Sequence, residues 1–156
     1  MIEVDVPGWK ACRFRHLVLD VNGTIAKDGA LIEGVLQRLA KLRTQLEVHL
    51  ITADTHGNQD SIDRSLGLTA VRIPVQDQVE AKLEYVQRLG ADGVVAMGNG
   101  ANDALMLEAA ALGIAIVGPE GSAVEALLKA KIAVSDIREA LDLLLYPKRL
   151  VATLRR

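Results

Sequence analysis

Short apolar segments rich in β-branched residues alternate with helix-like segments along almost the whole chain. Strands that alternate with helices of this length predict parallel crossover units, with helices covering both faces of one sheet. We therefore predict an α/β fold with a central parallel sheet. The predicted strands are LVLDV, VHLIT, AVRIP, GVVAM, GIAIVG and IAV, and the helices between them are predicted over 35–43, 56–66, 77–89, 101–112 and 122–131.

The two ends of the chain depart from this alternation. Residues 1–12 contain IEVDV before Pro7 and Gly8, which predicts an edge strand or a hairpin. The last stretch, 138–156, is predicted as a C-terminal helix. At 156 residues, without a repeat or a linker-like stretch, the sequence predicts one domain over 1–156.

Composition disfavours several classes of protein. Aromatic residues are 3% of the chain and the formal net charge is −2. Neither favours nucleic acid, which is bound by aromatic platforms and basic surfaces. No apolar stretch is long enough to cross a bilayer and no secretory signal is seen, so we expect no membrane partner and a cytoplasmic location. The single cysteine, Cys12, is expected to be a buried apolar residue, and no Cys or His spacing is typical of a zinc site.

Polar residues stand where three of the predicted strands end. HLVL is followed by Asp20, VHLI by Thr52, and VVAM by Gly98 and Asn99. The carboxyl ends of parallel strands lie at one edge of a sheet, where open α/β sheets bind ligands, so these groups are expected to converge. Lys82 lies on the helix before the third of these strands, and Asp103 in the first turn of the helix after it.

Such a set of side chains suits phosphoryl transfer. A carboxylate at a strand end can attack phosphorus as a nucleophile. A hydroxyl and an ammonium group can bind the phosphoryl oxygens and offset their charge, and a second acidic position can hold Mg²⁺. Because this reaction depends on positioning and charge neutralisation, a small set of groups is sufficient.

Four segments resemble, in order, the four motifs of the haloacid dehalogenase-like (HAD) superfamily. Within it, LITADT and GNGANDALMLEAAALGIAI are most similar to the phosphorylation domain of P-type ATPases. The resemblance runs over about 13–137 and implies a three-layer HAD-like Rossmannoid. Membrane segments and a nucleotide-binding insertion are lacking, so the chain resembles a free-standing relative rather than an ion pump. The four segments are Asp20-Val21-Asn22-Gly23-Thr24, Thr52, Lys82 and Gly98-Asn99-Gly100-Ala101-Asn102-Asp103.

The resemblance implies a role for each matching residue. Asp20 would be the nucleophile that forms an aspartyl-phosphate, while Thr52 would hydrogen-bond the phosphoryl group and Lys82 would offset its charge. Mg²⁺ would be the cofactor. The implied metal ligands are Asp20, the Asn22 carbonyl, Asn99 and Asp103, and the implied phosphate-binding residues are Asp20, Asn22, Gly23, Thr52, Ala53, Lys82 and Asn102.

Two positions depart from the pattern of the hydrolytic members. Asn22 stands where they have an Asp that protonates the leaving group and activates water. An amide cannot do this at neutral pH, and general acid–base catalysis is worth roughly 10²–10⁴-fold. Asn99 stands where relatives place a metal-binding Asp, and its neutral oxygen attracts Mg²⁺ less strongly. We therefore expect slow turnover or a long-lived phospho-enzyme.

The spacing leaves no room for a substantial cap domain, which many HAD enzymes insert near the site. Residues 25–34 suffice for a small flap, and 67–82 leave no room for a folded insert. An open site of this kind implies a small phosphorylated substrate or a phosphoprotein as partner, and a homo-oligomer.

Two other interpretations compete with the phosphohydrolase. One is a catalytically impaired binding or regulatory module, favoured by Asn22 and Asn99. The other, a phosphoacceptor receiver domain, is rejected because two βα units would have to precede its aspartate.

The three histidines are not at motif positions. His49 is expected to be a structural histidine within a strand. His56 near a helix start is a candidate substrate contact, and Asp54 is a candidate cap of that helix.

Overall fold

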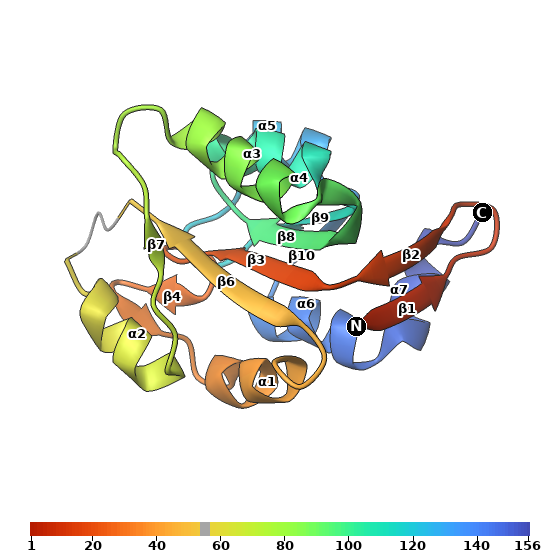
Figure 1. The fold of residues 1–156 in the computed structure, drawn as a ribbon, viewed down its shortest axis with the longest axis horizontal. Helices are drawn as coiled ribbons and strands as arrows, with labels where there is room; N and C mark the ends of the chain where they lie inside the picture. The colour runs from red at the N-terminus through yellow and green to blue at the C-terminus, as the bar shows by residue number, and fades with distance from the viewer. Residues whose placement is uncertain (54–56) are drawn as a thin grey trace.

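The computed structural model describes residues 1–53 and 57–156 and shows a six-stranded parallel sheet between two layers of helices (Figure 1). The strand order is β10-β9-β8-β3-β6-β7, so β3 lies in the centre with β8 on one side and β6 on the other. This confirms the predicted α/β class. The strands are β3 (His16–Asp20), β6 (Glu47–Thr52), β7 (Val71–Arg72), β8 (Val94–Gly98), β9 (Leu112–Ile116) and β10 (Ile132–Val134).

The helices divide between the two faces of the sheet, as Figure 1 shows. One layer holds α3 (Gln78–Leu89), α4 (Ala104–Ala109) and α5 (Val124–Lys129). The other holds α1 (Val35–Leu42), α2 (Gln59–Leu66), α6 (Ile137–Leu145) and α7 (Pro147–Leu154). Two 3₁₀ turns, η1 (Ala91–Gly93) and η2 (Ala101–Asp103), flank β8.

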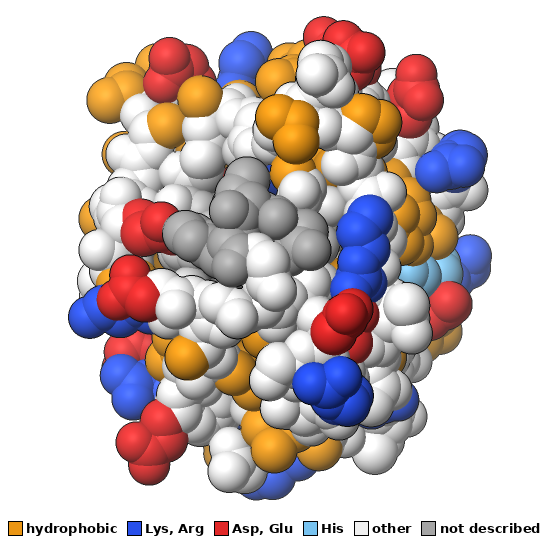
Figure 2. Space-filling model, turned by 90° about the vertical axis from the view of Figure 1, so that its left-hand side faces the viewer, with side chains coloured by type: hydrophobic (Ala, Val, Ile, Leu, Met, Phe, Trp, Pro, Cys, Tyr) orange, Lys and Arg blue, Asp and Glu red, His pale blue; other side chains and the backbone are white. Residues whose placement is uncertain are grey.

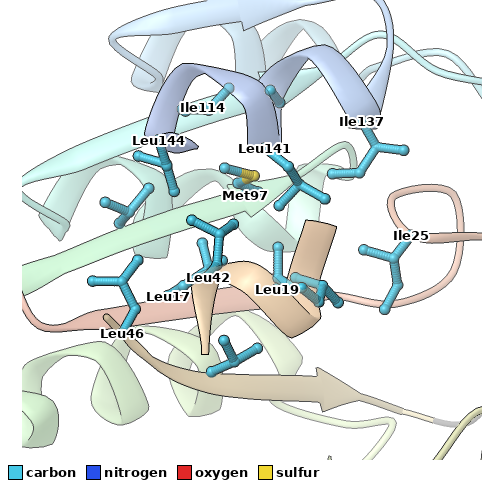
Figure 3. Packing of buried hydrophobic residues seen from close by; sticks show 14 of the residues in the cluster. Leu17, Leu19, Ile25, Leu42, Leu46, Met97, Ile114, Ile137, Leu141 and Leu144 are labelled. Atoms are coloured by element: carbon cyan, nitrogen blue, oxygen red, sulfur yellow. The ribbon is translucent and has the colours of Figure 1, made fainter. Parts of the chain in front are cut away.

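Alternation along β3 decides which layer each side chain faces. Leu17 and Leu19 are fully buried in the larger apolar cluster, with residues of α1 and α6 (Figure 3), whereas Val18 belongs to the cluster under α3, α4 and α5. Because side chains repeat every two residues in a strand, His16 and Asp20 share the face of Val18. Both therefore lie on the α3 side of the sheet.

Two small hairpins lie outside the central sheet. β1 (Ile2–Asp5) pairs antiparallel with β2 (Ala11–Phe14), so residues 1–12 belong to a hairpin, one of the two predicted alternatives. β4 (Ala26–Lys27) and β5 (Ala30–Leu31) form the small flap expected within 25–34. Residues 67–82 form β7 and the start of α3 rather than a cap.

The helix predicted over 138–156 is wrong as a single element. Helix α6 ends at Leu145, Tyr146 leaves the helical conformation, and α7 begins at Pro147. Proline has no N–H to donate and its ring would clash with the carbonyl of Leu143, so it begins a helix instead of continuing one.

The helices predicted over 101–112 and 122–131 are shorter than expected. The first is η2 followed by α4, because β9 already begins at Leu112. The second begins at Val124, since residues 118–123 form a loop whose Ala123 N–H donates to the Asn99 carbonyl.

The predicted start of the helix over 56–66, together with Asp54 and His56, lies outside the described residues; α2 begins at Gln59. In the described ranges, no helix is both long and apolar enough to span a bilayer.

Candidate active site

The structure brings the polar strand ends together at one edge of the sheet. Asp20 is the last residue of β3, Thr52 the last of β6, and Asn99 follows β8. All three line a cavity of about 220 Å³ at the carboxyl edge of the sheet. The other lining residues are Asn22, Ala53, Gln78, Lys82, Gly100, Asn102 and Glu120.

Figure 2 views the molecule from this edge. Among the residues coloured there, basic and acidic side chains are interspersed rather than gathered into a patch of one sign. This face therefore offers a local site, not a broad electrostatic surface for a polyanion.

A buried ion-pair cluster joins α3 to the floor of the cavity. Lys82 Nζ lies 2.8 Å from Asp20 Oδ1 and 2.6 Å from Asp103 Oδ1, and its side chain is only 1% exposed. α3 brings the lysine to the end of β3. One ammonium group thus serves two carboxylates.

The pKa values within this cluster follow from burial and from its charges. Burial, and next the Asp103 carboxylate, raise the pKa of Asp20 to about 7, although Lys82 opposes the shift. Burial by itself would lower the pKa of Lys82, but the two carboxylates outweigh it and leave that pKa raised. Lys82 therefore stays protonated, and Asp20 needs further positive charge nearby to be fully ionised at neutral pH.

Asp103 anchors the loop after β8. Its Oδ2 accepts hydrogen bonds from the backbone N–H groups of Asn99 at 3.0 Å and Gly100 at 2.9 Å, while Oδ1 binds Lys82. The approach requires a glycine at position 98, because a Cβ there would lie 2.5 Å from Asp103 Cγ. The Asp103 side chain is completely buried and does not line the cavity. In this arrangement it positions Lys82 and the loop.

Thr24 contacts both Asp20, at the end of β3, and Asn99, which follows β8. Its Oγ1 lies 3.2 Å from Asp20 Oδ2 and 3.3 Å from Asn99 Oδ1, and its single proton can go to only one of them. Both acceptor oxygens are therefore held close to the same hydroxyl. The sequence motif contained Thr24, but its contact with Asn99 requires the fold.

Gly23 adopts a left-handed conformation, with φ +79°, that few other residues tolerate. A Cβ at this position would lie 2.1 Å from Glu120 Oε2 and 2.6 Å from Asn99 Nδ2. Its N–H donates to the Ala26 carbonyl at 2.9 Å, and Gly23 does not line the cavity. Its observed contribution is thus close packing of the loop that carries Glu120.

Sequence reasoning missed two lining residues, Glu120 and Gln78. Glu120 lies in the loop after β9, whose carboxyl end faces the same edge as the other strand ends. The signal was present in the sequence, because the fifth predicted strand, GIAIVG, is followed directly by Pro-Glu-Gly. Gln78, the first residue of α3, accepts a hydrogen bond from Asn102 Nδ2 at 2.5 Å, which fixes that amide at the cavity wall.

The donors around the cavity fit a hard divalent cation. The Asp20 carboxylate, the Asn99 amide oxygen, the Glu120 carboxylate and Asn22 are all at the cavity, and Mg²⁺ prefers oxygen ligands of this kind together with waters. Without a cation, Asp20, Asp103 and Glu120 bring three acidic groups against one lysine. A divalent cation held there would offset this excess of acidic groups.

Comparisons with known proteins were made on both sequence and fold. No protein-family model matches the chain. An uncharacterized protein of Methanocaldococcus jannaschii, MJ0073, is 44% identical over 79 residues, which are 48% of this chain and 85% of that protein. A second uncharacterized protein of the same organism, MJ0072, is 49% identical over 39 residues, 25% of this chain and 89% of that protein.

Solved structures are similar over nearly the whole chain. A hydrolase described as HAD superfamily, subfamily III A, from Legionella pneumophila has a TM-score of 0.71 at 19% identity, covering 90% of this chain and 87% of that one. The 3-deoxy-D-manno-octulosonate 8-phosphate phosphatase of Moraxella catarrhalis, in complex with magnesium, phosphate and KDO, has a TM-score of 0.65 at 18% identity, covering 91% and 94%.

A phosphoserine phosphatase, solved as an analogue of its phospho-aspartyl intermediate, has a TM-score of 0.62 at 17% identity and covers 83% of this chain and 98% of that one. At such identities the likeness shows the fold. The chain therefore has the haloacid dehalogenase-like fold, and it belongs to one family with the uncharacterized Methanocaldococcus jannaschii protein MJ0073.

Proposed function

We propose that the chain is a Mg²⁺-dependent phosphohydrolase or phosphotransferase that acts through an aspartyl-phosphate on Asp20. The observation that carries the proposal is the buried Lys82 between Asp20 and Asp103, at the floor of a cavity rimmed by Thr52 and Asn99. Two structural neighbours support the same class of reaction: a phosphatase solved in complex with magnesium and phosphate, and a phosphatase solved as an analogue of its phospho-aspartyl intermediate.

In the first step a carboxylate oxygen of Asp20 would attack the phosphorus of a phosphate monoester. The new O–P bond forms as the bond to the leaving oxygen breaks, and the leaving alkoxide takes a proton. In the second step water attacks the phosphorus, the Asp20–phosphate bond breaks, and inorganic phosphate and the carboxylate are released. Lys82 and the Thr52 hydroxyl would offset and hold the charge on the phosphoryl oxygens.

The divalent cation, when bound, supplies the positive charge that keeps Asp20 ionised and attracts the phosphoryl group. Asp20, the Asn22 carbonyl and the Asn99 side chain would hold it, and the buried Asp103 would act indirectly, by positioning Lys82 and the loop that carries Asn99. Glu120 adds a carboxylate beside Asn99, which we propose offsets the charge lost with the aspartate that relatives have there.

Asn22 sets the speed of the reaction. Its amide cannot protonate the leaving oxygen or deprotonate the attacking water, so both proton transfers fall to solvent. We propose that hydrolysis of the aspartyl-phosphate is slow, and that leaving groups which need no proton react best.

The size of the cavity limits which part of a substrate it takes. At about 220 Å³ the cavity is smaller than the pockets of roughly 300–1,000 Å³ that enclose most of a drug-sized ligand. Among the described residues, the segment near this edge that resembles a cap is the β4–β5 flap. The remainder of a small phosphorylated substrate, or of a phosphoprotein, would lie outside the cavity.

Hydrolysis of p-nitrophenyl phosphate with and without Mg²⁺ tests the proposal. We expect weak Mg²⁺-dependent turnover that is lost in Asp20→Asn and rises by roughly 10²–10⁴-fold in Asn22→Asp. Equal turnover in the wild-type protein and Asp20→Asn would refute it.

A second candidate function is a binding or regulatory module with the same fold, and the paired Asn22 and Asn99 favour it. In that case Asn22→Asp brings no gain in hydrolysis, and Mg²⁺ gives no increase in the melting temperature of the wild-type protein. A Mg²⁺-dependent increase together with restored turnover excludes this alternative.

We also propose that the chain forms a homo-oligomer. Val124 and Leu128 lie one turn apart on α5 and are 64% and 78% exposed, a pair of large apolar side chains that a second copy would cover. Light scattering should give the mass of a dimer or larger for the wild-type chain and of a monomer for Leu128→Glu; a monomeric wild type excludes the proposal. The cytoplasmic location stays a prediction.

A further inference from the structure

A second group of ionisable side chains lies at the opposite, amino edge of the sheet. In the parallel pairing of β3 and β6, His16 is opposite Glu47 and Val18 is opposite His49. Glu47 and His49 are two residues apart and share one face, which is the α3 face that also carries His16. Asp20 lies four residues further along β3, roughly 13 Å away at the rise of a strand. The two groups are thus separate.

The distances within this group are those of ligand atoms around a common ion. His16 Nδ1 lies 3.1 Å from His49 Nε2 and 3.5 Å from Glu47 Oε2, and His49 Nε2 lies 3.8 Å from Glu47 Oε1. In a tetrahedral site with bonds of about 2.0–2.1 Å, neighbouring ligand atoms are about 3.3 Å apart. Only small side-chain adjustments would therefore bring all three groups to one ion.

The surroundings fix one of the rings and leave one side open. His49 Nδ1 is 2.9 Å from the hydroxyl of Tyr85 on α3, so this nitrogen is engaged and Nε2 faces the group. Metal-binding histidines are commonly oriented in this way through their second nitrogen. The two histidine side chains are 18% and 10% exposed, whereas Glu47 is 68% exposed and leaves room for water as a fourth ligand.

We propose that His16, Glu47 and His49 form a second cation site that takes Zn²⁺ or a neighbouring late first-row divalent ion. Two imidazoles and one carboxylate suit Zn²⁺, Co²⁺ or Ni²⁺ and not Mg²⁺, which prefers oxygen alone. To bind the ion, His16 Nδ1 and His49 Nε2 would each present a lone pair, which the tautomer with the proton on the other ring nitrogen allows.

Such an ion would join the amino ends of β3 and β6. These strands are neighbours at the centre of the sheet, and the ion would add a link where their first residues meet solvent. The site was invisible as a sequence motif, because Glu47-x-His49 and His16 meet only through the strand register.

Metal binding by the full chain, stripped with a chelator and titrated with Zn²⁺ against a fluorescent competitor, tests the proposal. The Asp20→Asn variant, in which the other candidate metal site is impaired, serves as the protein for all comparisons. We expect one tight Zn²⁺ in this protein and at least a tenfold loss of affinity in Glu47→Gln, whose exposed side chain can be changed without disturbing the fold. The matched control Glu125→Gln, an exposed acid on α5, should leave the affinity unchanged.

Two further measurements separate a metal site from a hydrogen-bonded cluster. Tyr85→Phe should weaken Zn²⁺ binding by about 10–100-fold, the usual effect of removing a partner of a ligating histidine. With Co²⁺, the visible absorption of a tetrahedral ion should appear and be lost in His49→Gln. Unchanged Zn²⁺ affinity in Glu47→Gln and Tyr85→Phe, or no Co²⁺ absorption in the parent protein, overturns the proposal.

Discussion

Replacing Lys82 by methionine should destabilise the fold far more than the loss of one surface charge would. The ammonium group is 1% exposed and lies within 2.8 Å of one carboxylate and 2.6 Å of another. Removing it leaves Asp20 and Asp103 buried beside each other without a cation. Breaking a buried ion pair from one side typically costs about 3–5 kcal/mol.

Urea unfolding followed by circular dichroism measures this cost. With an m-value of about 1–3 kcal/mol per molar, the midpoint should fall by at least about 1 M at pH 7.5. The control is the exposed ion pair of Lys129 with Glu108, at 2.8 Å, where Lys129→Met should change stability by less than about 1 kcal/mol.

The pH dependence gives the sign of the effect. Without Lys82 the pKa of the buried Asp20 carboxyl rises further. The folded variant therefore keeps Asp20 protonated at neutral pH, whereas in the unfolded chain the Asp20 carboxyl has its ordinary pKa and has lost this proton. The stability of Lys82→Met relative to wild type should therefore improve as the pH is lowered from alkaline values toward 7. It should change little below 7, because Asp20 of the wild-type protein, with its pKa of about 7, is protonated there as well. A loss below about 1 kcal/mol, or a loss that does not depend on pH, would refute this account of the cluster.

Three smaller predictions concern other contacts. Glu120→Gln should weaken Mg²⁺ binding by about 1 kcal/mol or more, about fivefold in affinity, as measured by calorimetry; unchanged affinity excludes Glu120 from the metal site. Asp136 caps α6 by accepting the Arg138 N–H at 2.8 Å, so Asp136→Ala should cost about 0.5–2 kcal/mol in urea unfolding, and no change would show that the cap is dispensable. Burial opposes ionisation of Asp63, but hydrogen bonds, including one from Arg72 at 2.6 Å, outweigh it and lower its pKa. This stabilisation is present above the ordinary pKa of 3.8 and is lost as the pH falls through the lowered one, so Asp63→Asn should be less stable than wild type at pH 7, by a margin that shrinks as the pH falls below 3.8.

The parallel sheet and the meeting of its strand ends were predictable because both follow from local patterns. Apolar runs of strand length alternate with helices, and one polar residue ends each of three runs. Parallel pairing then places Asp20, Thr52 and Asn99 at one edge without any knowledge of side-chain packing. The single helix predicted over 138–156 was wrong although Pro147 signalled the break, since proline cannot continue a helix.

Contacts that depend on loop paths or strand register were not predictable. Glu120 reaches the cavity only because the loop after β9 folds back over Gly23. Asp103 was expected to be a metal ligand. Its side chain instead lies beneath the loop after β8 and binds Lys82, because the glycine at position 98 has no Cβ to prevent this close approach. His49 was expected to be structural, and its two neighbours on the sheet become visible only with the register of β3 and β6.

The likeness to P-type ATPase phosphorylation domains stays a prediction from the motifs. It implies an aspartyl-phosphate on Asp20, and Asn22 gives the chemical reason for which that species would persist. The two arguments meet in one observable species, the phosphorylated protein.

Intact-protein mass spectrometry after incubation with acetyl phosphate and Mg²⁺, quenched in acid, tests the central claim most directly. We predict one added phosphoryl group on Asp20 that accumulates in the wild-type protein, is absent in Asp20→Asn, and decays faster in Asn22→Asp. A wild-type chain that gains no phosphoryl group under these conditions, or gains one equally in Asp20→Asn, would contradict the account.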